Sequence, residues 1–185
     1  MSTFKVNLQM GLLEPVCYQP SPHCDDRPPG MLIDTIVIHG ISLPPGEFGS
    51  TAIEDFFCGR LDSFSHPAYA AIAHLHVSAH LLIKRTGEIV QFVPFAKRAW
   101  HAGESFFKGR KQCNDFSIGI ELEGVDALSY ELVQYEYLAK VIHLLRQTYP
   151  MITRDRIIGH SDIAPSRKTD PGFAFDWAYL NGLLI

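Results

Sequence analysis

The sequence lacks three features that would place it in a specialised class of protein: an apolar run of transmembrane length, a run of lysine and arginine, and closely spaced cysteines. A membrane-spanning helix needs about 20 consecutive apolar residues, and the first residues lead into no apolar signal segment with a small-residue cleavage site. We therefore expect a cytoplasmic protein with no membrane partner. A net charge of -4 without a basic run also argues against nucleic acid as the main partner.

The four cysteines, Cys17, Cys24, Cys58 and Cys113, are spread over a chain of 185 residues. A chain of this length buries roughly 70% of its unfolded surface and needs no disulfides to fold. Because 46% of the residues are hydrophobic, a complete core is expected. We predict reduced thiols and a single monomeric domain over residues 1–185.

Apolar periodicity predicts an α/β domain. Short apolar runs bounded by turn residues are typical of strands, and the 3.6-residue spacing of apolar residues after Ser129 predicts the longest helix, which ends at Tyr149-Pro150. The expected strands cover residues 33–39, 75–84, 88–93, 116–122 and 156–159, and the expected helices cover 52–58, 129–149 and 175–184. The economical architecture is a central mixed sheet of about five strands with helices packed on it.

Two segments rich in proline and glycine interrupt this pattern. Residues 17–30 contain four prolines, which favours an irregular flap, and residues 40–50 form a second irregular loop. Both segments are expected to border the functional site. Directly after the second loop, Thr51 and Glu54 have the spacing of a capping box, which predicts the start of the helix at 52–58.

The segment GHSDIAPSRKTDPG, residues 159–172, contains the strongest chemical signal. It places His160, Lys168 and Asp170 in one short loop after an apolar run. An imidazole and a carboxylate suit zinc, and three side-chain ligands leave one position of the metal open for water. The best third ligand is His39, because it ends the apolar run 33–39 and lies before a loop, where sites are often assembled. Two structural histidines and a loop-capping aspartate are the simpler alternative.

A second group of histidines offers a rival metal site. His74, His76 and His80 have the same parity along the expected strand 75–84 and its flank, so they would project from one face. No carboxylate or open loop accompanies them, and buried histidines are usually satisfied by hydrogen bonds. We therefore favour a structural or site-lining role for these three residues.

Four phrases of the sequence resemble one enzyme family. They are TIVIHGISLPPGEFG, VSAHLLIKRTGEIVQFVPFAKRAWHAG, CNDFSIGIELEG and GHSDIAPSRKTDPGFAFDW, and they occur in the family's order from about Gly11 to the C-terminus. The family is that of the zinc-dependent N-acetylmuramoyl-L-alanine amidases of the AmpD type, which are relatives of phage lysozyme-like amidases and peptidoglycan recognition proteins. Four phrases in order make a chance resemblance improbable.

The resemblance assigns roles to the central residues of the site. His39, His160 and Asp170 match the zinc ligands, Glu121 matches the acid/base group, and Lys168 matches a cation that stabilises the oxyanion of amide hydrolysis. On a strand, Glu121 faces away from its apolar neighbours and shares its side with Glu123, which we interpret as a structural or supporting group.

The resemblance also implies residues that contact the substrate: Tyr69, Trp100, His101, Arg110 and Gln112. The chain departs from the family at three positions, because the cytoplasmic relatives carry Asn at Gly40 and Arg at both His76 and Gln112. Those arginines are associated with the carboxylates of the stem peptide, and neither glutamine nor neutral histidine supplies an equivalent charge. Peptide recognition is therefore expected to differ, whereas the metal chemistry is not.

The implied activity is hydrolysis of the amide between the lactyl group of 1,6-anhydro-N-acetylmuramic acid and L-alanine in cell-wall recycling, with a small muropeptide as the partner. Two alternatives are a lytic amidase that acts on polymeric peptidoglycan and a non-catalytic muropeptide-binding protein. The absence of a signal segment argues against the first of these. The presence of all three ligand types argues against the second.

Overall fold

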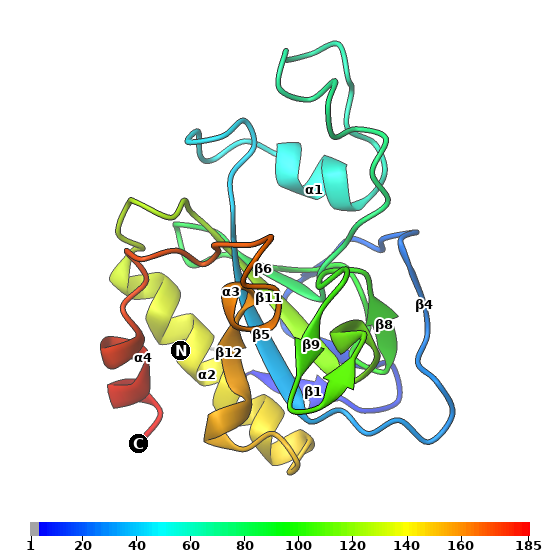
Figure 1. The fold of residues 1–185 in the computed structure, drawn as a ribbon, viewed down its shortest axis with the longest axis vertical. Coiled ribbons are helices and arrows are strands. Elements are labelled where there is room, and N and C mark those ends of the chain that lie inside the picture. Colours follow the sequence, from blue (N-terminus) through cyan, green and yellow to red (C-terminus); the bar gives the residue numbers. More distant parts are fainter. Residues whose placement is uncertain (1–3) are drawn as a thin grey trace.

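A six-stranded sheet forms the centre of the computed structural model, which describes residues 4–185 (Figure 1). In sheet order its strands are β12 (Ile157–Gly159), β5 (Thr35–Ile41), β11 (Ser117–Glu123), β6 (Leu81–Ile83), β7 (Ile89–Gln91) and β3 (Cys17–Tyr18). All neighbouring strands run parallel except β6 and β7, which are antiparallel. The prediction of an α/β domain with a central mixed sheet is confirmed, with one strand more than expected.

Four helices accompany this sheet: α1 (Ala52–Phe57), α2 (Leu132–Thr148), α3 (His160–Ile163) and α4 (Trp177–Leu183). α2 lies along one face of the sheet and α4 packs beside it (Figure 1). α2 begins three residues later than Ser129, because Glu131 is its N-cap and the Gln134 side chain accepts a hydrogen bond from the Glu131 backbone N–H. α1 lies in the upper part of Figure 1 and belongs to a second apolar cluster that includes Leu82 of β6 and Val90 of β7.

Side chains along the two central strands point alternately to the hydrophobic core and to the face of the functional site. Ile36 and Ile38 of β5 and Ile118 and Ile120 of β11 face α2 and form the main core with its buried residues Leu138, Val141, Ile142 and Leu145. Each such side chain contributes about 1.5–3 kcal/mol by leaving water. The residues between them therefore point to the opposite face of the sheet. That face carries the polar side chains of the functional site.

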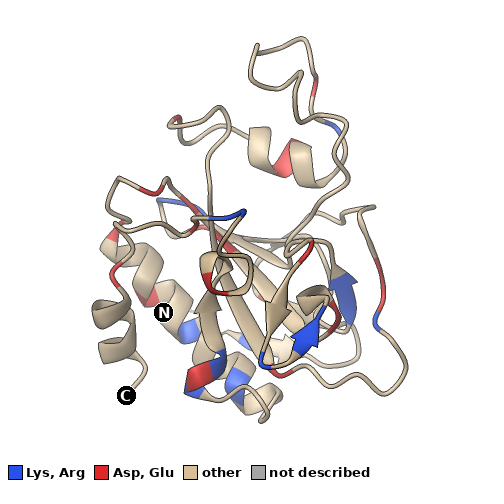
Figure 2. Cartoon of the chain, viewed as in Figure 1, with Lys and Arg blue, Asp and Glu red and all other residues tan. Residues whose placement is uncertain are grey.

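Three small two-stranded sheets surround the central one. They pair β1 (Lys5–Asn7) with β2 (Leu12–Glu14), β4 (Cys24–Asp26) with β8 (Lys97–Ala99), and β9 (Phe106–Phe107) with β10 (Arg110–Lys111). Figure 2 shows acidic positions on β4 beside basic positions on β8. Asp25 pairs with Arg98 and Asp26 pairs with Lys97, each at 2.5 Å. Two single 3-10 turns, η1 (Cys113–Asp115) and η2 (Arg154–Arg156), complete the elements.

The expectation that residues 17–30 are irregular throughout is wrong. The segment contains β3, which pairs with the edge strand β7, and β4, which pairs with β8. Both strands are short: β3 ends before Pro20 and β4 lies between Pro22 and Pro28, so no proline interrupts either ladder. The segment also sends Arg27 inward, where its guanidinium donates to the carbonyls of Phe95 and Ser117.

Two further local predictions are corrected by long-range contacts. The hairpin at 75–84 and 88–93 is real but short, since only β6 and β7 pair. The helix at 52–58 is present without the capping box: Thr51 Oγ1 donates to Asp55, and the buried Glu54 carboxylate pairs with Lys84 at 2.5 Å. The four cysteines form no disulfide. Within residues 4–185, no helix combines the length and apolar character that crossing a bilayer requires.

Candidate metal centre

The candidate site lies at the carboxyl ends of β5 and β11. These strands are parallel neighbours, and their register sets His39 directly beside Glu121. Register partners project from the same face of a sheet, so both side chains rise on the face opposite α2. His39 is 1% exposed and Glu121 is 8% exposed. The sheet therefore holds a buried imidazole and a buried carboxyl group side by side.

The loop after β12 brings two further groups to this end of the sheet. His160 begins α3, and the Ser161 N–H donates to the carbonyl of Asp170 at 3.0 Å, which closes the loop onto its own start. The Tyr130 hydroxyl donates to the carbonyl of Pro171 at 2.9 Å and anchors the far side of the loop. Asp170 is thus held next to His160 although the two residues are ten positions apart in the sequence.

Three potential ligand atoms converge at this point. His39 Nδ1 lies 2.9 Å from His160 Nδ1, and Asp170 Oδ2 lies 3.1 Å from each of these nitrogens. Neighbouring ligand atoms around a tetrahedral zinc ion with bonds of about 2.0 Å are about 3.3 Å apart. Among residues 4–185, His39, His160 and Asp170 are the one group with metal-ligand geometry.

The hydrogen bonds of the two histidines indicate which ring nitrogens carry protons and which are free to bind a cation. His160 Nε2 lies 3.1 Å from the carbonyl oxygen of Ala102, which can only accept, so Nε2 carries the ring proton. His160 Nδ1 then faces the Asp170 carboxylate. Burial lowers the pKa of His39 to about 4, so the His39 ring is neutral at pH 7. Two imidazoles and a carboxylate are a donor set that zinc accepts, so the residues fit this metal.

Glu121 adds an unpartnered carboxyl group to the site. Its Oε2 is buried and makes no hydrogen bond to residues 4–185. Burial, together with the nearby Asp170, raises the pKa of Glu121 well above its ordinary value, and the positive charge of Lys168 opposes this shift. Glu121, Lys168 and the three ligand residues line one cavity of about 180 Å³. A carboxyl group that readily takes a proton therefore lies in the same cavity as a cation.

Glu123, on the same face as Glu121, has a different role. Its two carboxylate oxygens accept hydrogen bonds from the backbone N–H groups of Gly49 and Arg85. It therefore ties the loop at 40–50 to the end of β11, in agreement with the structural interpretation.

Among the expected substrate contacts, Trp100 lines the cavity of the metal centre. Its indole N–H donates to Asp25 at 3.1 Å, and its ring stacks on His23, which in turn stacks on the exposed His76. The segment at 17–30 therefore supports one wall of the cavity.

Three other expected contacts, Arg110, Tyr69 and His101, pack against or bond to other parts of the protein. Arg110 donates two hydrogen bonds from Nη2 to Asp34 and lies over the ring of Phe116. Tyr69 is buried in the apolar cluster that includes α1 and does not line the cavity. His101 has protein groups at both ring nitrogens, His39 at 2.9 Å and Ser117 at 3.0 Å. His101 lines the cavity, but both of its ring nitrogens face protein groups, whereas Arg110 uses only Nη2 in its bonds to Asp34.

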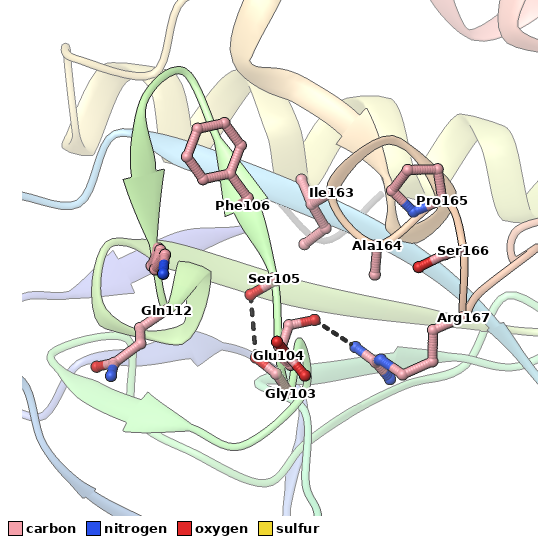
Figure 3. Close-up of a pocket in the computed structure, with 11 residues that line it drawn as sticks. Gly103, Glu104, Ser105, Phe106, Gln112, Ile163, Ala164, Pro165, Ser166 and Arg167 are labelled. Atoms are coloured by element: carbon pink, nitrogen blue, oxygen red, sulfur yellow. Dashed lines mark hydrogen bonds between the residues drawn. The ribbon is translucent and has the colours of Figure 1, made fainter.

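Gln112 lines a second groove, of about 700 Å³, beside the metal loop (Figure 3). One wall is Gly103–Phe106 and the other is Ile163–Arg167, which directly precedes Lys168. Arg167 spans the two walls, since its guanidinium donates to the carbonyls of Ala102 and Glu104. Lys111 and Gln112 complete the lining.

The rival histidines do not form a site. Residues 75–80 are not a strand, so His74 and His76 lie in exposed loop while His80 is buried. His80 Nδ1 accepts from the Gly119 N–H, and its Nε2 lies 3.2 Å from the Lys97 carbonyl. His80 is a satisfied core histidine.

Sequence reasoning missed Tyr130 and the Ala102 carbonyl as parts of the site. The available signal was glycine within a predicted strand or directly after one, which often marks a close approach of another group. A β-carbon on Gly40 would lie 2.2 Å from the Tyr130 hydroxyl, and one on Gly119 would lie 2.4 Å from the His101 ring.

The fold and the site together define an amidase, and residues 29–173 match the N-acetylmuramoyl-L-alanine amidase family. The chain belongs to this family. The 1,6-anhydro-N-acetylmuramyl-L-alanine amidase AmpD of Escherichia coli (strain K12) is 57% identical over 171 residues, which are 92% of this chain and 93% of that protein. The AmpD of Haemophilus influenzae is 50% identical over the same shares.

Two solved amidase structures have a similar fold. A crystal structure of a selenomethionine derivative of AmpD matches with a TM-score of 0.92 at 55% identity and covers 95% of this chain and 98% of that chain. The Escherichia coli amidase AmiD in complex with anhydro-N-acetylmuramic acid-L-Ala-D-gamma-Glu-L-Lys gives a TM-score of 0.61 at 29% identity, over 86% of this chain and 61% of that one.

Proposed function

We propose that this protein is a zinc-dependent amidase that hydrolyses the bond between 1,6-anhydro-N-acetylmuramic acid and L-alanine in muropeptides during cell-wall recycling. The observation that carries the proposal is the convergence of His39, His160 and Asp170 beside the unpartnered carboxyl group of Glu121. The similarity to AmpD proteins over nine-tenths of both chains supports the substrate. A cytoplasmic location is part of the proposal and follows from a role in recycling.

The side chains of the site divide the chemistry between them. Zinc held by His39, His160 and Asp170 supplies Lewis acidity, which lowers the pKa of water and polarises a carbonyl. Glu121 takes a proton from the attacking water and returns it to the nitrogen of L-alanine as the C–N bond breaks. Its raised pKa suits this role, because the carboxyl group must hold the proton between the two steps.

Lys168 stabilises the negative charge that develops on the carbonyl oxygen. Its ammonium group lines the same cavity as Glu121 and the ligands. A fixed donor of this kind lowers the barrier by about 3 kcal/mol. The products are the free lactyl carboxylate of the sugar and a peptide with a free amino group.

The groove lined by Gln112 is the proposed location of the stem peptide. It begins next to the loop that carries Lys168 and contains Lys111 and Arg167, which supply positive charge for peptide carboxylates. Trp100 offers a partly buried aromatic surface at the other side of the metal centre, where a sugar ring can pack.

Mass spectrometry of the products tests the proposal. Purified protein is given either anhydro-muropeptides or intact sacculi, before and after zinc is removed with a chelator. We expect anhydro-N-acetylmuramic acid and free peptide from the small substrate, loss of the reaction after chelation, and recovery when zinc is restored. Release of peptide from sacculi alone would favour a lytic amidase. Binding of the muropeptide without cleavage would favour a non-catalytic binding protein.

A further inference from the structure

The inference concerns the residues behind the metal ligands and begins at the carbonyl oxygen of Cys113. The Ser117 hydroxyl donates to this oxygen at 2.6 Å and also lies 3.0 Å from His101 Nε2. A carbonyl can only accept and a hydroxyl has one proton. The Ser117 oxygen must therefore accept the proton of His101 Nε2.

The proton on His101 Nε2 determines which ring nitrogen of His39 carries a proton. A neutral histidine carries one ring proton, so His101 Nδ1 presents a lone pair. His39 Nε2 lies 2.9 Å from that nitrogen and must be the donor. His39 Nδ1 is then left without a proton, and it faces His160 and Asp170.

Ala102, the residue after His101, sets the tautomer of His160. The carbonyl of Ala102 accepts from His160 Nε2, which leaves the Nδ1 lone pair of His160 facing His39 Nδ1 and Asp170 Oδ2. Two consecutive residues, His101 through its side chain and Ala102 through its backbone, thus set the tautomers of both histidine ligands. We call residues 101–102 the brace.

The brace is itself held from several sides. Asn114 Oδ1 accepts from the backbone N–H groups of both His101 and Ala102, at 3.1 and 2.7 Å. The Arg167 guanidinium donates to the Ala102 carbonyl at 2.7 Å. The His101 ring lies against Gly119, where a β-carbon would come within 2.4 Å of the ring. These contacts leave the brace little freedom to turn.

We propose that the brace, with Ser117 behind it, is a positioning device that presents the Nδ1 lone pairs of His39 and His160 to the metal. The inference rests on the proposed zinc function. His101 does not contact the substrate in this proposal; it acts through His39. Hydrogen-bond partners of metal-binding histidines typically change metal affinity by about 10- to 100-fold when removed.

The first test is long-range proton–nitrogen NMR of the imidazole rings in metal-free wild-type protein at neutral pH. We expect the proton on Nε2 of His39, His101 and His160. A proton on Nδ1 of His101 or His39 would overturn the proposed order of protons. This measurement needs neither zinc nor activity.

The second test is the zinc dissociation constant, measured by competition with a chelator. His101→Leu should bind zinc about 10- to 100-fold more weakly. His101→Asn should recover most of the affinity, because its amide oxygen can accept from His39 where Nδ1 does. Ser117→Ala, a small change that keeps the ring, should weaken zinc binding less, and its NMR spectrum should show the His101 proton shared between both nitrogens.

Ser21→Ala is the matched control, because this buried hydroxyl donates to Phe57 and touches no histidine ring. It should bind zinc as the wild type does. If the wild type binds zinc and both His101→Leu and Ser117→Ala bind it equally well, the brace is refuted and the zinc proposal stands. If the wild type itself binds no zinc, both proposals fall.

Discussion

The hydroxyl of Tyr130 occupies the space that a β-carbon on Gly40 would need. The ideal position of that carbon is 2.2 Å from the hydroxyl oxygen and 3.5 Å from the ring carbon that bears it. The same hydroxyl donates to the carbonyl of Pro171, the residue after the candidate ligand Asp170. The absence of a side chain at Gly40 is therefore linked to the position of a metal ligand.

This relationship predicts non-additive effects of two substitutions. Gly40→Ala should destabilise the protein by about 1–3 kcal/mol, because it forces Tyr130 aside, and should weaken zinc binding by loosening the loop at Pro171. Tyr130→Phe should cost about 0.5–1.5 kcal/mol through the lost hydrogen bond. The double variant should be little less stable than Tyr130→Phe alone. Urea denaturation of the four proteins measures the coupling, and strictly additive changes would contradict the steric explanation.

The ligand assignment predicts the effect of removing each donor. His39→Ala, His160→Ala and Asp170→Ala should each lose both zinc and activity, because two remaining donors hold the ion poorly. The wild type should purify with close to one zinc per chain, as measured by elemental analysis. Full zinc occupancy in any one variant would remove that residue from the set of ligands.

Substitutions at two other positions should reduce catalysis without reducing metal binding. Glu121→Gln and Lys168→Ala should keep their zinc but lose at least about a hundredfold in kcat, as expected for an acid/base group and an oxyanion donor. Zinc content and kcat are measured on the same preparations. Turnover near that of the wild type at saturating substrate would refute the catalytic role of the residue concerned.

The groove beside the metal predicts an effect on substrate binding alone. Gln112→Arg adds a charge near Lys111 and far from the scissile bond, so it should lower KM for anhydro-muropeptides with little change in kcat. The gain should be on the order of 1 kcal/mol, about fivefold in KM, and should shrink as salt is added. A substrate with amidated peptide carboxylates is the control. An unchanged KM on the charged substrate would place the stem peptide elsewhere.

Arg27 predicts a stability effect outside the site. Its guanidinium donates to the carbonyls of Phe95, Asn114, Asp115 and Ser117. Arg27→Met leaves these oxygens without their donor and should lower the free energy of unfolding by at least about 3 kcal/mol. The control is Arg60→Met at an exposed ion pair with Asp55, which should change stability by less than about 0.5 kcal/mol. Equal losses in the two variants would show that Arg27 is not a structural anchor.

The parts of the site that follow from local sequence were predictable. His160, Lys168 and Asp170 lie within one short loop, and alternation along β11 predicts that Glu121 faces away from the core. His39 could be placed because it lies near the end of an apolar strand. The resemblance to the amidases then joined these segments into one site.

The parts that depend on distant partners were not predictable. No pattern in the sequence indicates that Arg110, which is expected to contact substrate, also pairs with Asp34, 76 residues earlier. The strand at Cys17 forms because Val90 offers it an edge. The Ala102 carbonyl is a backbone group, so no residue type marks its role. In each case the missing information is which segments meet in three dimensions.

The register of β5 against β11 has a consequence for refolding. Because His39 and Glu121 are paired partners, a slip of β11 by one residue would turn Glu121 towards α2 and place Ile120 or Leu122 beside the ligands. A chain misfolded in this way keeps its secondary structure but has no reaction centre. In a partly refolded sample, every molecule with the native register should therefore have full activity and the others none. Total activity should then be proportional to the fraction of chains with the native strand alignment.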